Sequence, residues 1–171
     1  EISLPNSISK EFIKKIMLCS DTILCGIGCR DTLRMEAGLS LYGNELNENL
    51  TPVDSGLTWA IDKKRLKNGN FNGAKKIINQ LNKGTNQKKI GIQIKSKSIL
   101  RPSMDICNNG TKVGFISSGG FSPSLNHSIG IGYLDKKFLN NTENLHCLIR
   151  GNLDKIEVTK LPFVKHNYWR G

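Results

Sequence analysis

The first residues that could do chemistry lie in the phrase GIGCRD, where Gly26 and Gly28 are followed by Arg30 and Asp31. A glycine turn that leads into a helix can hold an anion, because unpaired backbone N–H groups and the positive end of the helix dipole point outward there. Arg30 would add a guanidinium that can bind a carboxylate through two parallel hydrogen bonds. The alternative is a surface arginine that pairs with Asp31 or Glu1, and the phrase alone leaves both interpretations open.

Other catalytic and metal-binding patterns are weak. The phrase SSGGFSPSLNHS supplies Ser118 and His127, but G-x-S-x-G is absent and the glycines are typical of hairpin turns. The two glycines before Arg30 lack the third glycine and the downstream acidic residue of a dinucleotide site. The three histidines and five cysteines show no metal-ligand spacing, and the odd cysteine number argues against a disulfide framework. We therefore expect no metal, and packed, inert thiols at Cys25 and Cys29.

The charge balance suggests anionic partners. The chain carries 25 Lys and Arg against 14 Asp and Glu, a net charge of +11. The lysines are scattered in twos and threes with little aromatic interleaving, so we expect solvated faces or acidic partners and no nucleic-acid site. No apolar run approaches the roughly 18 residues of a membrane span, so we expect no membrane partner. A chain that begins at Glu1, in what reads as a strand, suggests a piece of something longer.

The first 84 residues read as mixed structure. A strand ends at residues 2–4, and apolar residues from Ile8 to Met17 then recur at helical spacing. A second helix should follow Arg30, with Asp31 as its cap and Gly43 at its end. Residues 62–73 read as charged turns, and a short helix then ends at Gly84. We place a boundary near Gly84.

Beyond Gly84 the apolar period changes to two. Ile90, Ile92 and Ile94 alternate with polar residues or glycine, and Val113 with Phe115 does the same. Clusters of turn residues separate these segments, which indicates an antiparallel barrel or sandwich of about six strands with these five side chains inside. The expected fold class is α+β.

Four phrases carry a resemblance to a known family. They are GIGCRDTLRMEAGLSLYGNEL, TPVDSGLTWAI, GTKVGFISSGGFSPSLNHSIGIGYL and KLPFVKHNYW, in this order. Together they resemble the C-terminal half of the glycine cleavage T proteins, the aminomethyltransferases. The resemblance covers almost all of the chain. It implies that residues 1–84 are the end of an α/β folate-binding region and that residues 85–171 form a C-terminal antiparallel Greek-key β-barrel.

The resemblance also implies an activity and a site. The family transfers a methylene unit from an aminomethyl group on the lipoyl arm of the H protein to tetrahydrofolate, releasing ammonia. Its folate-binding glutamate, arginine and tyrosine match Glu1, Arg30 and Tyr168. A carboxylate can pair with pterin N–H groups, an arginine can engage a polar or anionic group, and a tyrosine offers a ring face and a hydroxyl. The simpler alternatives are a frayed terminal Glu1, and a Tyr168 packed in the core beside Phe163 and Trp169.

The family's catalytic aspartate lies in an N-terminal half that this chain lacks, so the resemblance implies no catalytic residue here and partners that include the missing half, H protein and tetrahydrofolate. Two alternatives remain open. One is a folate-binding module related to iron–sulfur assembly factors or to sarcosine and dimethylglycine dehydrogenases, and the other is a basic nucleic-acid binder. The expected compartment is the cytoplasm of a bacterium or the mitochondrial matrix of a eukaryote.

Overall fold

The computed structural model describes residues 2–169, which fall into two compact units. The first unit runs to Arg30 and the second begins at Asp31. Helix α2, Ile27–Glu36, includes residues of both. Among the described residues, no helix is long and apolar enough to cross a lipid bilayer.

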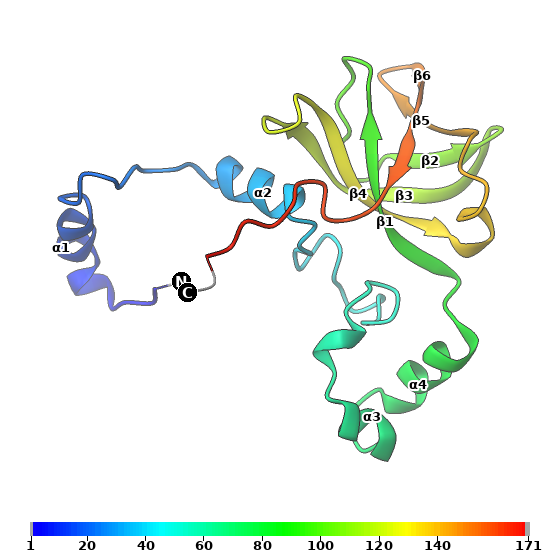
Figure 1. The fold of residues 1–171 in the computed structure, drawn as a ribbon, viewed down its shortest axis with the longest axis horizontal. Helices are drawn as coiled ribbons and strands as arrows, with labels where there is room; N and C mark the ends of the chain where they lie inside the picture. Colours follow the sequence, from blue (N-terminus) through cyan, green and yellow to red (C-terminus); the bar gives the residue numbers. More distant parts are fainter. Residues whose placement is uncertain (1, 170–171) are drawn as a thin grey trace. The chain divides into compact units, whose positions relative to one another are not determined.

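The first unit contains helix α1, Asn6–Ile16 (Figure 1). Pro5 precedes the helix with φ −58°, and two lysines in the last turn face the negative end of the helix dipole. The predicted helix is thus confirmed, whereas the strand expected at residues 2–4 is wrong, because this segment has no sheet partner. None of the residues of α1 is buried. Large apolar side chains of this unit stay exposed, among them Ile13, Leu18, Ile23 and Leu24.

Helix α2 begins and ends earlier than the sequence predicts. It starts at Ile27, so Asp31 lies inside the helix and is not its cap. It ends at Glu36 because Gly38 adopts φ +68°, and the N–H groups of Gly38 and Leu39 then donate to the carbonyl oxygens of Met35 and Arg34. Gly38 is thus the residue that ends α2, and the helix stops before it reaches Gly43, the expected end.

Two further helices lie in the second unit (Figure 1). Helix α3, Lys63–Asn68, begins where the Asp62 carboxylate accepts a hydrogen bond from the N–H of Arg65, and it ends at Gly69 with φ +65°. The sequence pattern assigned this stretch to turns, because its charged residues hide the helical period. Helix α4, Ala74–Lys83, ends at Gly84 as predicted. Two short 3-10 helices complete the set: η1, Thr58–Ala60, and η2, Lys136–Phe138.

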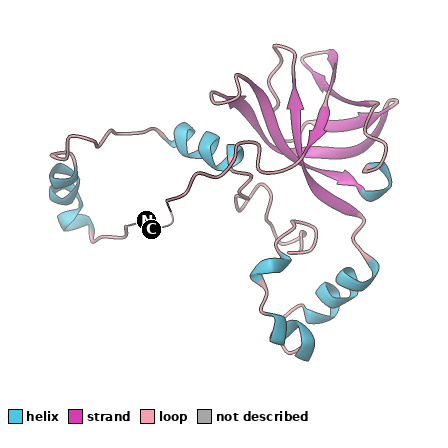
Figure 2. Ribbon diagram, in the orientation of Figure 1, coloured by secondary structure: helices cyan, strands magenta, loops and turns pink. Residues whose placement is uncertain are grey.

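The described strands form one antiparallel sheet in the order β6-β5-β2-β3-β4-β1-β7, coloured magenta in Figure 2. Their bounds are β1 Gln87–Ile94, β2 Asp105–Asn108, β3 Thr111–Ser122, β4 His127–Asp135, β5 Leu145–Ile149, β6 Asn152–Lys155 and β7 Glu157–Thr159. Strands β2, β3 and β4 are consecutive neighbours, and β1 lies beside β4 after a long connection, which is a Greek-key order. The expected class, α+β with an antiparallel barrel-like sheet, is confirmed.

The core of the sheet contains most of the predicted residues. Ile90, Ile92, Ile94 and Val113 are buried in its main apolar cluster. Phe115 is the exception, since it is only half-buried and its ring stacks on Tyr133 at 5.4 Å.

Two bulges in β3 explain why Phe115 departs from the alternation. Ile106 and Cys107 of β2 pair with Gly114 and Lys112, which leaves Val113 as an extra residue. Pairing with β4 leaves Ser117 extra in the same way, between Ile116 and Ser118. Each extra residue shifts the side-chain alternation by one, so Ile116 is buried where a regular strand would bury Phe115.

Candidate functional site

Arg30 lies on α2 with its side chain exposed. Asp31, its expected alternative partner, pairs instead with Arg34, with 2.8 Å between Oδ1 and Nε. No described carboxylate forms an ion pair with Arg30. The other alternative partner, Glu1, lies outside the described residues, as does the folate role assigned to it. Within residues 2–169, the Arg30 guanidinium therefore remains available to an anion.

One turn after Arg30, Arg34 enters a buried polar cluster. Its side chain is 8% exposed, and its Nη1 lies 2.6 Å from Oε2 of the fully buried Glu45. Its Nη1 also donates to the carbonyl oxygen of Leu39, and its Nη2 donates to Oγ of Ser118 at 2.8 Å. The sequence pattern does not mark this residue, because a single arginine in an amphipathic helix resembles a solvated side chain.

Both the side chain and the backbone carbonyl of Glu45 accept further hydrogen bonds. Its carboxylate accepts hydrogen bonds from the N–H of Leu41 at 3.0 Å and the Ser117 hydroxyl at 2.5 Å. Its carbonyl oxygen accepts one from the Tyr133 hydroxyl at 2.7 Å. Burial raises the pKa of Tyr133 to about 12, with smaller contributions from nearby carboxylates and an opposing one from the hydrogen bond with Ser55. The cluster ties α2 and its following loop to β3 and β4, and it is fully hydrogen-bonded.

The serine and histidine considered for catalysis have separate structural roles. The Ser118 hydroxyl accepts hydrogen bonds from Arg34 and Asn44. The His127 ring contacts the carbonyl oxygen of Leu125 and the side chain of Gln93. Strand pairing sets His127 opposite Ser122, whereas Ser118 lies opposite Ile131, so Ser118 and His127 do not form a catalytic pair.

A second buried carboxylate lies at the end of α2. Glu36 is 4% exposed and accepts hydrogen bonds from the hydroxyls of Ser122 at 2.5 Å and Ser124 at 2.7 Å, and from the N–H of Ser124. Burial by itself raises the pKa of Glu36, but these hydrogen bonds together outweigh it and the pKa is lowered. The serines of the phrase FSPSL thus hold the end of α2 and do not merely form a turn.

The segment that carries Tyr168 is attached to the same place. The N–H of Val164 donates to the carbonyl oxygen of Glu36 at 3.0 Å, and Nε2 of His166 lies 2.9 Å from the carbonyl oxygen of Ala37. The Tyr168 ring lies against His166, with 4.8 Å between centroids, and the residue is 56% exposed. Phe163 packs against an apolar cluster, but Tyr168 does not. Core packing is therefore not the role of Tyr168 here.

The thiols of the first unit differ from expectation. Cys25 and Cys29 are exposed and not packed, because this unit buries no side chain among its described residues. The pKa of Cys29 is raised, chiefly by the neighbouring Cys25 and further by partial desolvation, which disfavours the reactive thiolate. Among residues 2–169, no three His, Cys, Asp or Glu side chains form a group that could hold a metal ion.

Two family domains match this chain, one before the sheet and one over it. Residues 1–65 match the GCVT N-terminal domain, and residues 87–165 match the glycine cleavage T-protein C-terminal barrel domain. The chain is 40% identical over 173 residues to a mitochondrial aminomethyltransferase of Mesembryanthemum crystallinum, covering 99% of this chain and 42% of the relative. It is 34% identical over 169 residues to the mitochondrial aminomethyltransferase of Gallus gallus, covering 99% of this chain and 43% of that relative.

A solved structure gives the same result. The crystal structure of the glycine cleavage system aminomethyltransferase T from Bartonella henselae superposes with a TM-score of 0.90 at 31% identity, over 98% of this chain and 46% of that one. This chain thus spans less than half the length of the relatives that it matches. With one domain match before Gly84 and another after it, the chain belongs to the glycine cleavage T-protein family.

Proposed function

We propose that this chain is the C-terminal part of a tetrahydrofolate-dependent aminomethyltransferase of the glycine cleavage system. In the proposed reaction the methylene unit of an aminomethyl group on the lipoyl arm of H protein passes to tetrahydrofolate, and ammonia is released. The observation that carries the proposal is the succession of two family domain matches along nearly the whole chain. The catalytic aspartate of the family would be supplied by a preceding segment.

Arg30 and Tyr168 are the proposed folate-binding residues in the described part of the chain. The Arg30 guanidinium is exposed and forms no ion pair with a described carboxylate, so it can engage a polar or anionic group of the ligand. Tyr168 has an accessible ring, supported by His166, that can pack on a flat heterocycle. Glu1 is proposed to pair with pterin N–H groups. No metal is required by these roles.

The first unit has many exposed apolar side chains, which favours its being covered by another part of a longer protein. Its exposed apolar side chains include Leu18 at 85%, Ile23 at 81% and Ile27 at 82%. A segment of this size without a buried core does not hold its structure unaided. We propose that an N-terminal region of the kind present in the longer relatives covers these side chains and completes the folate cavity. In this arrangement residues 1–84 form the end of the folate-binding region and residues 85–171 form the barrel.

Folate affinity tests the proposed site. In the chain extended at its N-terminus to the length of its relatives, Arg30→Ala should weaken tetrahydrofolate binding by roughly 1.5 to 3 kcal/mol, the range for a hydrogen bond to a charged group. Isothermal calorimetry can measure this loss. Arg65→Ala is the control, because Arg65 is an exposed arginine on α3. Equal affinity of wild-type and Arg30→Ala proteins would contradict the assignment.

The same extended protein distinguishes the reaction from its alternative. Folate binding without transfer from loaded H protein would favour a folate-binding module outside glycine cleavage. The proposed compartment is the mitochondrial matrix if the source is a eukaryote, as for the mitochondrial relatives, and the cytoplasm if it is a bacterium.

A further inference from the structure

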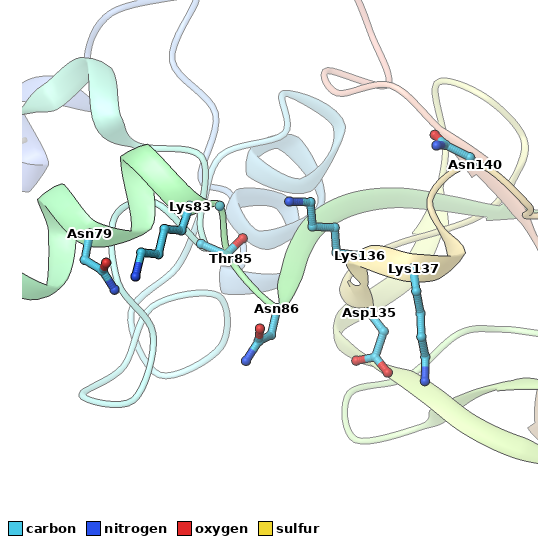
Figure 3. A pocket seen from close by; sticks show the side chains of 9 residues that line it. Asn79, Lys83, Thr85, Asn86, Asp135, Lys136, Lys137 and Asn140 are labelled. Atoms are coloured by element: carbon cyan, nitrogen blue, oxygen red, sulfur yellow. The ribbon is translucent and has the colours of Figure 1, made fainter.

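An open hollow of about 830 Å³ lies between the end of α4 and the turn after β4. Figure 3 shows Lys83 projecting from α4, and Lys136 and Lys137 from η2. We call this feature the basic hollow and define it by these three lysines. All three side chains are exposed, and none forms an ion pair with a carboxylate in the described part of the chain.

The backbone holds the lysine-bearing elements together. The N–H of Lys136 donates to the carbonyl oxygen of Asn86 at 2.8 Å, which attaches η2 to the segment just before β1. Gly84, at the end of α4, adopts φ +84°, and a Cβ placed there would lie 2.5 Å from Nζ of Lys136. The ammonium group of Lys136 therefore lies against the backbone that leaves α4. The charges of the basic hollow are presented by fixed elements and not by a loose tail.

The lining chemistry indicates the class of ligand. Three lysines against the single carboxylate of Asp135 leave a positive wall, and the remaining polar side chains are Asn79, Thr85, Asn86 and Asn140. Lysines and amides donate hydrogen bonds to carboxylates. The lining residues include no arginine and no aromatic side chain, and the ring of the adjacent Phe138 is covered by Nζ of Lys137, 5.1 Å from the ring centroid. This arrangement argues against stacked bases and against bidentate phosphate binding. Small-molecule pockets are mostly enclosed by apolar and aromatic side chains, whereas this hollow is open to solvent and is lined by charged, amide and hydroxyl side chains.

We propose that the basic hollow is a docking surface for an acidic segment of a partner polypeptide. Charge complementarity selects this occupant, because side-chain carboxylates along a peptide can reach the separated lysines at once. The proposal does not depend on the folate site, since every residue of the basic hollow belongs to the second unit and lies outside the proposed folate residues.

A fluorescent oligoglutamate peptide is a suitable probe, titrated into residues 1–171 at physiological ionic strength and followed by anisotropy. The triple variant Lys83→Gln, Lys136→Gln, Lys137→Gln should bind the peptide about ten-fold more weakly, as expected for the loss of several exposed charge pairs. The matched control changes three exposed lysines of α3, Lys63, Lys64 and Lys67, to glutamine. It removes the same net charge and should bind nearly as the wild type does.

Two results would overturn the proposal. An equal loss in both triple variants would mean that the peptide senses only the net charge of +11. A single-stranded oligonucleotide of matched charge that binds more tightly than the peptide, and loses affinity in the same variant, would assign the basic hollow to nucleic acid. Thermal unfolding of each variant shows whether its fold is intact, and the single variants Lys83→Gln and Lys137→Gln should each give part of the loss.

Discussion

Arg34 and Glu45 illustrate how a buried ion pair can be kept without being a catalytic site. Glu45 is fully buried and Arg34 nearly so, and the two side chains also form hydrogen bonds with five other residues. Such a pair is retained only if every polar atom is satisfied, because unpaired buried charge is expensive. Its physical role here is to fix the end of α2 on the barrel.

Removing one partner of this pair should be costly. Arg34→Met leaves the Glu45 carboxylate buried without its counter-charge, so we expect a loss of about 3 to 5 kcal/mol in the free energy of unfolding. Urea denaturation followed by circular dichroism measures it. The control is Lys112→Met, which breaks the pair of Lys112 with Asp105, whose side chains are 60% and 48% exposed. That change should cost about 0 to 1 kcal/mol. Equal losses would show that the Arg34 pair is not structural.

Glu36 gives stability a pH dependence. The pKa of Glu36 is lower in the folded chain than its ordinary value, so its contribution is complete above the ordinary value and is lost as the pH falls through the folded pKa. Glu36→Gln should reduce the free energy of unfolding by about 1 to 3 kcal/mol at neutral pH. Denaturation at a series of pH values should show the two proteins converging in acid. A difference that stays constant with pH would contradict the ionised role of Glu36.

At the scale of elements, strand β3 departs from the regular alternation of buried and exposed side chains because it contains two bulges. Its neighbours approach so closely that some positions accept only glycine. A Cβ on Gly119 would lie 2.6 to 2.8 Å from three atoms of Leu100, two of them backbone, whereas a Cβ on Gly120 would meet only the flexible end of Met35 at 3.1 Å. The close approach of Leu100 therefore requires a glycine at position 119, whereas position 120 has no such backbone contact.

These two glycines make a matched test. Gly119→Ala should destabilise the barrel by about 1 to 3 kcal/mol, because overpacking must displace the Leu100 backbone. Gly120→Ala should change stability by less than about 1 kcal/mol, since a methionine end can move aside. Thermal unfolding of both variants gives the comparison. A larger loss of stability for Gly120→Ala than for Gly119→Ala would contradict this explanation of the two glycines.

The sequence correctly predicts the elements in which apolar residues recur at a regular spacing. Helices α1 and α4 and strand β1 follow from their apolar spacing alone, and Gly84 correctly marks the end of α4. The failures have local causes. The cap Asp62 was hidden among charged residues, and the bulge at Val113 shifted the alternation that would have buried Phe115.

Contacts between residues distant in sequence were beyond pattern reading. Arg34 meets Ser118 across 84 positions and Glu36 meets Ser122 across 86, and neither pair has a local signal. Arg30 drew attention through its glycine-rich turn, but its proposed folate role, like that of Tyr168, came only from the four phrases of the family resemblance. Buried polar partners become visible only when the chain folds, because their residue types are common on surfaces.

At the scale of the whole molecule, this chain supplies a barrel with its own core and a first unit without one. The relatives are more than twice as long as the matched region. Folate binding spends much of its free energy on an enclosing cavity, and transfer also needs the reacting groups held in geometry, which can account for about 7 to 11 kcal/mol of barrier. Residues 1–171 alone should therefore lack both properties.

The most direct test measures methylene-tetrahydrofolate formed from aminomethyl-loaded H protein. We predict no product above background with residues 1–171 alone, and transfer once an N-terminal segment completes the chain to the length of its relatives. Arg30→Ala in the completed chain should reduce transfer at low tetrahydrofolate. Full-rate product formation by residues 1–171 alone, or no transfer by a completed chain that folds and binds tetrahydrofolate, would contradict the proposed function.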